Sequence, residues 1–345
     1  MKRISLFALV GLLSVTTSCS DSNSSMSETA TPEGVEWAAN VPTLSGNVES
    51  VEITAYTLKD SFGETVTDKV KGKQIYKFDQ QGNVVESALY KSDGSLNRKE
   101  ADKYDSQGNK IEEAWYNGDG SLNWKATYKY DSQGNKIEYA WYKNDGSLDW
   151  KYLYKYDSQG NKIEEADYNS NGSLDWKYLY KYDSQGNQIE KAWYNSDGSL
   201  DGKALSKYDS QGNHIESASY SSDGSLRYKH LHKYDAQGNM IEYAWYNGDG
   251  SLGEKSLFKC DSNGHRIEYA KYNSDGLLDW KGFYKYDSQG NNIEETIYNG
   301  DGSLNTKCTY KYKYDAQGNL IEKVEYRGDV MTPTEKTEWK ITYRK

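Results

Sequence analysis

The sequence is short of the aliphatic residues that fill a large protein core. Only 35% of its 345 residues are hydrophobic, although 33 tyrosines and 10 tryptophans are among its aromatic residues. Such a chain has too little Leu, Ile and Val for a large globular core, yet it is far too aromatic for a disordered one. The composition therefore favours a thin, extended β structure.

The sequence also has fewer basic than acidic residues, and few His and Cys residues. Lys and Arg number 42 against 52 Asp and Glu, a net charge of −10, and charges of both signs are interleaved along the chain. This pattern excludes nucleic acid as an expected partner, because that partner needs a clustered basic footprint. With four His and three Cys, the sequence carries no catalytic or cofactor motif, and it predicts a protein that is not an enzyme.

Two weak metal patterns are present. His230 and His232 share a strand face, and Asn195, Asp197 and Asp201 faintly resemble a calcium loop. The histidines lack accompanying ligands at metal spacing, and the loop lacks the ligand density of an EF-hand. We therefore interpret the first as a chance surface pair and the second as a hairpin turn, and we assign no metal.

What the sequence has in abundance is one repeated unit. A turn glycine recurs every 26 residues within Asp-x-x-Gly-Asn or, once, Asp-x-x-Gly-His, and a final copy follows a two-residue insertion. A period of this length marks an architecture in which each unit stacks on its neighbours. The turn glycines are Gly82, Gly108, Gly134, Gly160, Gly186, Gly212, Gly238, Gly264, Gly290 and Gly318.

Each repeat contains two alternating, aromatic-rich runs separated by two turn sequences. In the copy at residues 125–146 the turn sequences are Asp-Ser-Gln-Gly and Asn-Asp-Gly, which have the chemistry of tight turns. No apolar stripe of helical period survives between turns spaced about every 12 residues. The predicted fold is all-β: a repeat array of antiparallel β-hairpins, a meander of about twenty strands in an open or superhelical sheet.

Some columns of the repeat are constant. Glu stands four residues after every turn glycine, Tyr eight residues after it, and Lys recurs at the seventeenth and twenty-first positions. Columns of opposite charge on neighbouring strands would form ladders, each pair contributing about 0.2 to 1 kcal/mol. We expect these ladders to flank apolar rows along the sheet.

Other columns vary, and tryptophan concentrates in them. If Asp119 and Gly120 form a two-residue type I′ turn, Trp115 lies opposite Trp124 on one face, and Glu112 lies with Lys125 and Lys129 on the other. By the same register Trp141 lies opposite Trp150. The Asp-Ser-Gln-Gly loop instead favours a type I turn, a left-handed glycine and a bulge, which leaves the facing of the strands open.

The variable aromatic columns supply the candidate ligand contacts. Exposed Trp and Tyr serve as anchors at interfaces and stack on sugar rings, although aromatic residues also pack β-sheets without any ligand. The candidates are Trp115, Trp124, Trp141, Trp150, Trp176, Trp193, Trp245 and Trp280.

The N-terminus resembles a bacterial lipoprotein signal peptide. Lys2 and Arg3 precede an apolar run too short to span a bilayer, and small residues lead to Cys19. Residues 1–18 are then the signal peptide, a lipid on Cys19 attaches the chain to the membrane, and residues 19–42 form a flexible tether. An ordinary secretory signal is the alternative.

The start of the tether is similar to the export signal of surface lipoproteins in Bacteroidota. This predicts a lipid anchor in the bacterial outer membrane with surface exposure, the periplasmic face being the alternative. Cys260 and Cys308 lie about four strands apart, roughly 19 Å at ~4.8 Å per strand, which predicts two free cysteines.

The array itself is bounded by atypical ends. Residues 43–79 look like a degenerate N-terminal capping repeat, residues 80–327 are the tandem repeats, and residues 328–345 are a charged C-terminal capping strand. Capping units of stacked folds are expected to be atypical, and charged edge strands discourage aggregation.

The element at residues 128–135, Tyr-Lys-Tyr-Asp-Ser-Gln-Gly-Asn, resembles the core of YD repeats, the β-hairpin units of RHS-type proteins. The resemblance recurs over about residues 76–326. It implies hairpin units, which RHS proteins spiral into hollow shells that often surround a toxin, and which related proteins use in cell-surface contacts. Because this period is longer and no cargo domain follows the array, we expect a short superhelical or flat sheet and not a closed capsule.

These observations predict a non-enzymatic, membrane-anchored repeat protein that acts as a cell-surface binding or scaffold module. Its partner would be a protein or a component of the cell envelope. The alternative is a multivalent carbohydrate-binding module, in which the Trp and Tyr columns act as weak subsites that gain strength by multivalency.

Overall fold

The computed structural model describes residues 44–61, 64–328 and 333–344. These residues belong to one compact unit, Ala39–Lys345. The predicted signal peptide, the lipidation site Cys19 and the tether lie outside the described residues. Among the residues that are described, no helix is long and apolar enough to cross a membrane.

The unit is built from 22 antiparallel β-strands in one sheet, which confirms the predicted all-β meander. Each repeat contributes two strands, one before and one after its Asn-Asp-Gly turn. The strands are β1 (Val48–Ser61), β2 (Glu64–Phe78), β3 (Val84–Tyr90), β4 (Leu96–Tyr104), β5 (Lys110–Asn117), β6 (Leu122–Tyr130), β7 (Lys136–Lys143), β8 (Leu148–Tyr156), β9 (Lys162–Asn169), β10 (Leu174–Tyr182), β11 (Gln188–Asn195), β12 (Leu200–Tyr208), β13 (His214–Ser221), β14 (Leu226–Tyr234), β15 (Met240–Asn247), β16 (Leu252–Cys260), β17 (Arg266–Tyr272), β18 (Leu278–Tyr286), β19 (Asn292–Asn299), β20 (Leu304–Tyr314), β21 (Leu320–Arg327) and β22 (Pro333–Tyr343).

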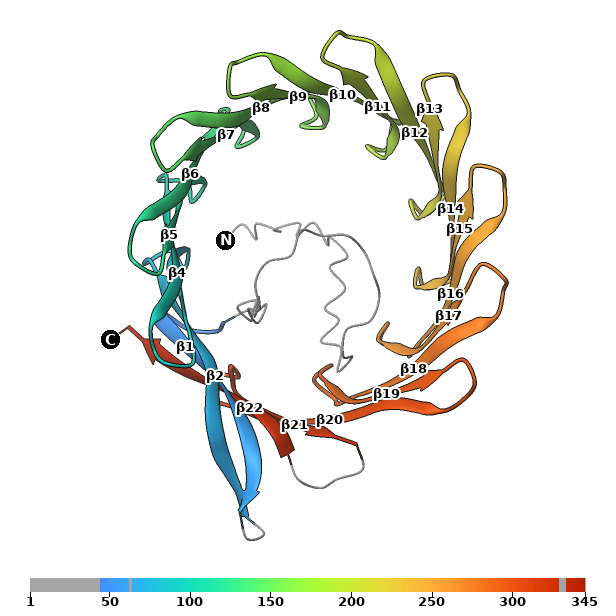
Figure 1. The fold of residues 1–345 in the computed structure, drawn as a ribbon. Coiled ribbons are helices and arrows are strands. Elements are labelled where there is room, and N and C mark those ends of the chain that lie inside the picture. The colour runs from blue at the N-terminus through green and yellow to red at the C-terminus, as the bar shows by residue number, and fades with distance from the viewer. Residues whose placement is uncertain (1–43, 62–63, 329–332, 345) are drawn as a thin grey trace, which may run out of the picture. The chain divides into compact units, whose positions relative to one another are not determined.

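The sheet closes on itself, so the prediction of an open or superhelical sheet is wrong. Every strand pairs with the next, and β1 also pairs with β22, from Val48 opposite Tyr343 to Thr57 opposite Glu335. The strands therefore form a complete ring (Figure 1). The two ends predicted to cap an open array instead satisfy each other's backbone hydrogen bonds, so the described strands include no edge strand.

The closure has its own apolar core. Val48, Val51, Ile53 and Tyr76 are buried together, and Val51 is completely inaccessible. We call this region, where β22, β1 and β2 meet, the closure seam. The two ends of the described sheet also bond directly there, since the Arg344 N–H donates to the Asn47 carbonyl oxygen over 2.8 Å.

Asn319 adds a polar contact to the closure seam. This side chain is 2% exposed, and its Nδ2 donates to the Ser45 carbonyl oxygen (2.9 Å) and to the Tyr343 hydroxyl (2.7 Å). Its Oδ1 accepts from the Ser45 N–H over 2.6 Å. The last copy of a repeated turn asparagine is thus used to hold the start of the sheet.

The Asp-x-x-Gly loops have the predicted turn. In one copy the Gly134 N–H donates to the Asp131 carbonyl oxygen (3.1 Å), and Gly134 has a φ of 86°. The Asp131 carboxylate accepts the N–H groups of Gln133 and Asn135. A type I turn followed by a left-handed glycine is confirmed, and the same pattern recurs in each copy.

The second loop of each repeat, which ends in Asp-Gly or once in Asn-Gly, forms the same turn, so the predicted type I′ turn is wrong. Gly120 has a φ of 84°, and its N–H donates to the Asn117 carbonyl oxygen. The longer loop moves the strand pairing by one residue, but Asn123 is an extra residue in β6 that moves it back. Trp115 therefore lies opposite Trp124 as predicted, for a different reason.

This register separates constant from variable residues. The constant face of the sheet carries the Glu, Tyr and two Lys columns, with small residues such as Ala140 between them. The variable face carries the columns at positions 2, 5, 7, 16, 18 and 20 after the turn glycine, together with the recurring tyrosine at position 22, such as Tyr130 opposite Lys136. In β7 and β8 it presents Lys136, Tyr139, Trp141, Trp150, Tyr152 and Tyr154.

Ion pairs run along the constant face. Each glutamate of the column contacts a lysine of the same hairpin at 2.8 to 3.0 Å, as in Lys129 with Glu138 and Lys155 with Glu164. Glu112 contacts Lys125 as predicted, but its second partner is Lys103, because Lys129 is used by the next glutamate. The predicted ladder of opposite charges is confirmed.

A tyrosine ties each hairpin to the one before it. The Tyr130 hydroxyl donates to the Lys110 carbonyl oxygen over 2.8 Å, and the same bond recurs in seven further copies. In one copy Cys260 replaces this tyrosine. Cys260 is free, as predicted, and Cys308 is completely buried.

Candidate functional site

Four of the eight candidate tryptophans come together on the variable face. Trp115 stacks on Trp124 with ring centroids 5.2 Å apart, and Trp124 lies 4.1 Å from Trp141. Trp150 meets Trp141 edge-on at 6.0 Å, in the cross-strand pair that the register predicts. The four rings cross β5 to β8 without a break.

Three tyrosines extend this row. Tyr139 stacks between Tyr128 and Tyr152, with centroid distances of 5.0 and 5.6 Å, and it meets Trp141 edge-on. We call this set the aromatic strip: Trp115, Trp124, Tyr128, Tyr139, Trp141, Trp150 and Tyr152. Sequence analysis named its tryptophans but missed the tyrosines, although their position in variable columns of the same parity marks them.

Polar side chains hold one end of the aromatic strip. Glu113 accepts from Trp115 Nε1 over 2.8 Å and from the Tyr128 hydroxyl over 2.7 Å. Burial, with this bond to Glu113, raises the pKa of Tyr128, and burial raises the pKa of Tyr139 to about 12. Both phenols are therefore neutral hydrogen-bond donors at neutral pH.

The other four tryptophans are not part of the strip. Trp193 lies over Gly202 and donates to Asp201 over 2.7 Å, and Trp245 lies over Gly253. Trp280 contacts Tyr269 at 4.5 Å, and Trp176 lies opposite Asp167. The candidate residues thus form one cluster and four separate positions.

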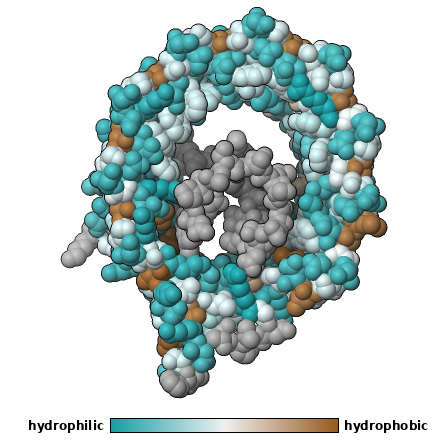
Figure 2. All heavy atoms as spheres, viewed as in Figure 1, coloured by the Kyte–Doolittle hydropathy of each residue, from teal (hydrophilic) through white to brown (hydrophobic). Residues whose placement is uncertain are grey.

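Exposure also divides the tryptophans. Trp150 is 45% exposed and Trp245 is 36% exposed, whereas the others are more covered. The visible surface of the ring is mostly hydrophilic, with hydrophobic residues in small separated patches (Figure 2). Trp150 is therefore the point where the aromatic strip is most open to a ligand.

The variable face continues into a histidine group on β13 and β14. His214 and His232 lie 5.2 Å apart, and His230 Nδ1 lies 2.6 Å from the Tyr243 hydroxyl. His214 Nε2 and His232 Nδ1 are buried without a hydrogen-bond partner. Burial lowers the pKa of all three imidazoles. The predicted pair His230 and His232 thus belongs to a group of three, which β13 and β14 of one repeat bring together.

One position on the variable face holds a carboxyl group whose pKa is raised. Burial, with the nearby Glu165 and Asp175 charges, raises the pKa of Asp167 to about 6. It takes the column position that Trp141 holds in the preceding repeat.

The calcium-like residues Asn195, Asp197 and Asp201 form a hairpin turn in which Asp197 accepts from Ser199. A different carboxylate group, Glu100, Asp102 and Glu113, has its oxygens close together.

Comparisons with known proteins are sparse. No protein-family model matches the chain, and no curated protein matches it. Among solved structures, the crystal structure of TcdB2-TccC3 matches with a TM-score of 0.33 and 13% identity, over 85% of this chain and 20% of that one. The chain therefore spans about a fifth of the length of that structure.

Two further structures are similar at the same level. A porin-like protein from Bacteroides uniformis matches with a TM-score of 0.27 and 10% identity, over 87% of this chain and 98% of that one. The Photorhabdus luminescens Tc holotoxin pore matches with a TM-score of 0.25 and 10% identity, over 77% and 19%. Likenesses this distant do not bear on function, which has to be argued from the residues themselves.

Proposed function

We propose that this chain is a non-enzymatic binding or scaffold module, anchored to the outer membrane by a lipid on Cys19, whose partner is a protein or a component of the cell envelope. The observation that carries the proposal is the division of the sheet into two faces. The constant face repeats the same ion pairs and tyrosines in each unit, which a structural role explains. The variable face differs from unit to unit, as a recognition surface does.

The aromatic strip is the proposed contact region. Aromatic anchors are enriched where binding energy concentrates at interfaces. The strip is contiguous and rigid, because its rings stack on one another and Glu113 orients the first of them. A rigid surface of this kind loses little conformational entropy on binding. We assign the repeats to the YD type because the hydrogen bonds of the repeated Tyr and Asp residues recur along the array.

A direct test compares a strip variant with a matched tryptophan outside the strip. We expect Trp141→Ser with Trp150→Ser to lower co-sedimentation of the protein with isolated cell envelopes by about tenfold, or about 1.4 kcal/mol. Trp280→Ser should leave it unchanged. Circular dichroism must show the same β signal in all variants. Equal binding by the strip variant and the wild type would contradict the proposal.

Carbohydrate binding is the second candidate, and it depends on exposure. The rings of Trp115, Trp124 and Trp141 cover one another, so Trp150 and Trp245 are the tryptophans with ring surface left for a sugar. Glycan-array binding that is lost in Trp150→Ser and Trp245→Ser would favour this alternative. An array without signal would end it.

The membrane anchor is a separate part of the proposal. In cells, Cys19→Ser should move the protein from the membrane fraction to the supernatant, and it should abolish labelling with a fatty-acid probe. Surface protease treatment of intact cells would separate outward display from the periplasmic alternative, because only outward display makes the chain accessible.

A further inference from the structure

One group of carboxylates interrupts the pattern of the repeats. Glu100 and Asp102 lie on β4, and Glu113 lies on β5 directly opposite Asp102. In the next repeat the corresponding positions are Ala126, Tyr128 and Tyr139. Two acidic side chains directly opposite each other are destabilising unless something positive lies between them. The first full repeat therefore carries a feature that the array does not need for its own folding.

The carboxylate oxygens are close enough to share one ion. One oxygen from each of Glu100, Asp102 and Glu113 lies within 4.8 Å of the others. Oxygens that each bind Ca²⁺ at about 2.3 to 2.6 Å lie no farther than about 5 Å apart. The three side chains thus have the spacing of a partial coordination shell.

Asp102 is the buried member of the group. Its side chain is 4% exposed, and its Oδ1 is buried without any hydrogen-bond partner. Its other oxygen, Oδ2, lies 3.4 Å from the Tyr104 hydroxyl. A buried carboxylate oxygen without a partner is costly, and such atoms need a specific explanation, of which a bound ion is one.

An ammonium group now sits among the carboxylates. Lys110 Nζ lies 2.6 Å from Asp102 Oδ2, 3.5 Å from Glu100 Oε1 and 3.6 Å from Glu113 Oε2. One positive charge against three negative charges leaves the group at −2. The Lys110 side chain is 29% exposed, so its flexible stem can carry the ammonium group into solvent.

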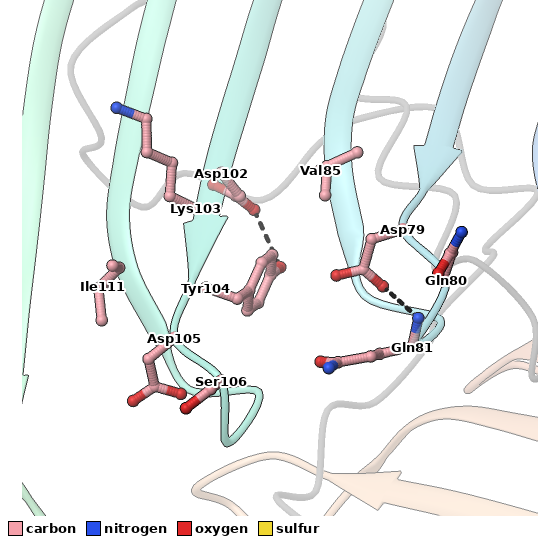
Figure 3. A pocket seen from close by; sticks show the side chains of 10 residues that line it. All are labelled: Asp79, Gln80, Gln81, Val85, Asp102, Lys103, Tyr104, Asp105, Ser106 and Ile111. Atoms are coloured by element: carbon pink, nitrogen blue, oxygen red, sulfur yellow. Dashed lines mark hydrogen bonds between the residues drawn. The ribbon is translucent and has the colours of Figure 1, made fainter.

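A pocket lies beside Asp102, one member of the group. It has a volume of about 680 Å³ and is lined by Asp102 and Tyr104 on β4, by Val85 and Ile111, and by the turn residue Asp79 (Figure 3). The dashed contact between Asp102 and Tyr104 marks where the carboxylate meets this space. The buried member of the group therefore borders a solvent-accessible pocket.

We propose that Glu100, Asp102 and Glu113 form a binding site for a divalent cation of the Ca²⁺ type. The cation enters this site by displacing the Lys110 ammonium group. Hard divalent cations prefer carboxylate oxygens, and Ca²⁺ accepts irregular geometry completed by water. The exchange replaces one positive charge by two, which compensates the excess negative charge of the group. A bound cation would join β4 to β5 beside the aromatic strip, because Glu113 also accepts hydrogen bonds from Trp115 and Tyr128 of the strip.

The test is calcium titration of the full chain by isothermal calorimetry. We expect Ca²⁺ to bind the wild type with one site, and Lys110→Met to bind it about tenfold more tightly because the competing ammonium group is gone; tenfold is about 1.4 kcal/mol. Glu100→Gln and Asp102→Asn should each weaken binding at least about tenfold in the Lys110→Met background. Glu100 is the safer of the two for folding, since it is less buried.

The matched control is Lys136→Met, one repeat further on, where the equivalent lysine lies near tyrosine rings. It should leave calcium affinity unchanged. Thermal unfolding with and without Ca²⁺ provides a second measurement, in which Ca²⁺ should restore the stability lost in Lys110→Met but not that lost in Lys136→Met. Absence of binding in both the wild type and a folded Lys110→Met variant would overturn the proposal and leave the group as an ion-pair cluster.

Discussion

The closure seam and the repeat array hold the same sheet together by different means. At the seam, aliphatic side chains such as Val51 and Ile53 are buried to 0% and 3% exposure. In the array, the fully covered residues are mostly alanines such as Ala126 and Ala140, and the recurring contacts are turn hydrogen bonds, ion pairs and the tyrosine bond. A hairpin in the array has a similar neighbour on each side, whereas β1 and β22 have to recognise each other.

The comparison teaches where sequence information is concentrated. Strand pairing within the array is specified by turns a few residues away, so shallow and repetitive contacts are sufficient. The seam joins segments almost 300 residues apart and carries a large loop-closure entropy. It therefore needs the deeper apolar burial that the array does without.

The sharpest way to test this difference is one substitution made in both regions. Ile53→Ala at the seam should lower the free energy of unfolding by about 2 to 4 kcal/mol, because it leaves a cavity in a buried cluster. Ile137→Ala in the array, where the side chain is 36% exposed, should cost less than about 1 kcal/mol. Denaturant unfolding measures both, and equal losses would mean that the seam is not special.

The turn asparagines offer a polar version of the same comparison. Asn319→Ala should cost about 1 to 3 kcal/mol, because the Ser45 N–H and carbonyl oxygen lose their buried partners. Asn135→Ala removes a bond within one partly exposed loop, and about 0.5 to 1 kcal/mol is expected. Hydrogen exchange at β1 should increase in the first variant alone; unchanged exchange there would contradict the assigned role.

Acid should lower the stability of the array at the histidine group and not that of the closure seam. The pKa values of His214, His230 and His232 are lowered by burial, so the folded state holds these imidazoles neutral. Their contribution to stability is complete above the ordinary pKa of about 6.5 and is lost as pH falls through the lowered folded values.

Replacing the three histidines together by Gln should flatten this loss of stability below about pH 6.5, the ordinary histidine pKa, because the folded pKa values are shifted downward. His265→Gln is the control, because His265 lies in a turn outside this group. Melting temperatures measured across the range would reveal the difference. An unchanged slope in the triple variant would show that other groups cause the acid sensitivity.

The smallest effect is expected for one rung of the ion-pair ladder. The Lys129 side chain is 64% exposed in its pair with Glu138, so a double-mutant cycle with Ala should yield about 0.2 to 1 kcal/mol. Salt at 1 M should abolish most of this coupling, since the Debye length falls to about 3 Å. A coupling that persists in high salt would point to packing of the lysine stem.

The repeat, its two turns and the alternation of faces could all be predicted from the sequence, because they depend on nearby residues. The tryptophan pairs were predicted from a wrong turn type. The pairs are nevertheless correct, because Asn123 is an extra residue in the strand that compensates for the extra residue in the loop. Turn preference alone does not reveal a bulge that follows two residues later.

Closure could not be predicted in this way. The apolar alternation of β1 and the charged pattern of β22 both suit edge strands, and their pairing depends on the curvature accumulated over all the hairpins between them. The carboxylate group was more accessible to sequence reasoning: Glu100 and Asp102 are the only acidic residues in two columns that elsewhere hold aromatic residues, His or small residues. Comparing columns of equal parity would have placed them beside Glu113.

The bond between Arg344 and Asn47 brings the two ends of the described sheet within hydrogen-bonding distance. Because these ends are close, the polypeptide could begin at another strand and keep the same cyclic order of strands. A circular permutant in which Arg344 is linked to Asn47 and new ends are placed in the exposed loop at Asp145 and Gly146 would keep each strand beside its present neighbours, since cuts at such exposed tips are well tolerated. In that molecule the seam would become one more hairpin, and two strands of the array would have to find each other across the full length of the chain.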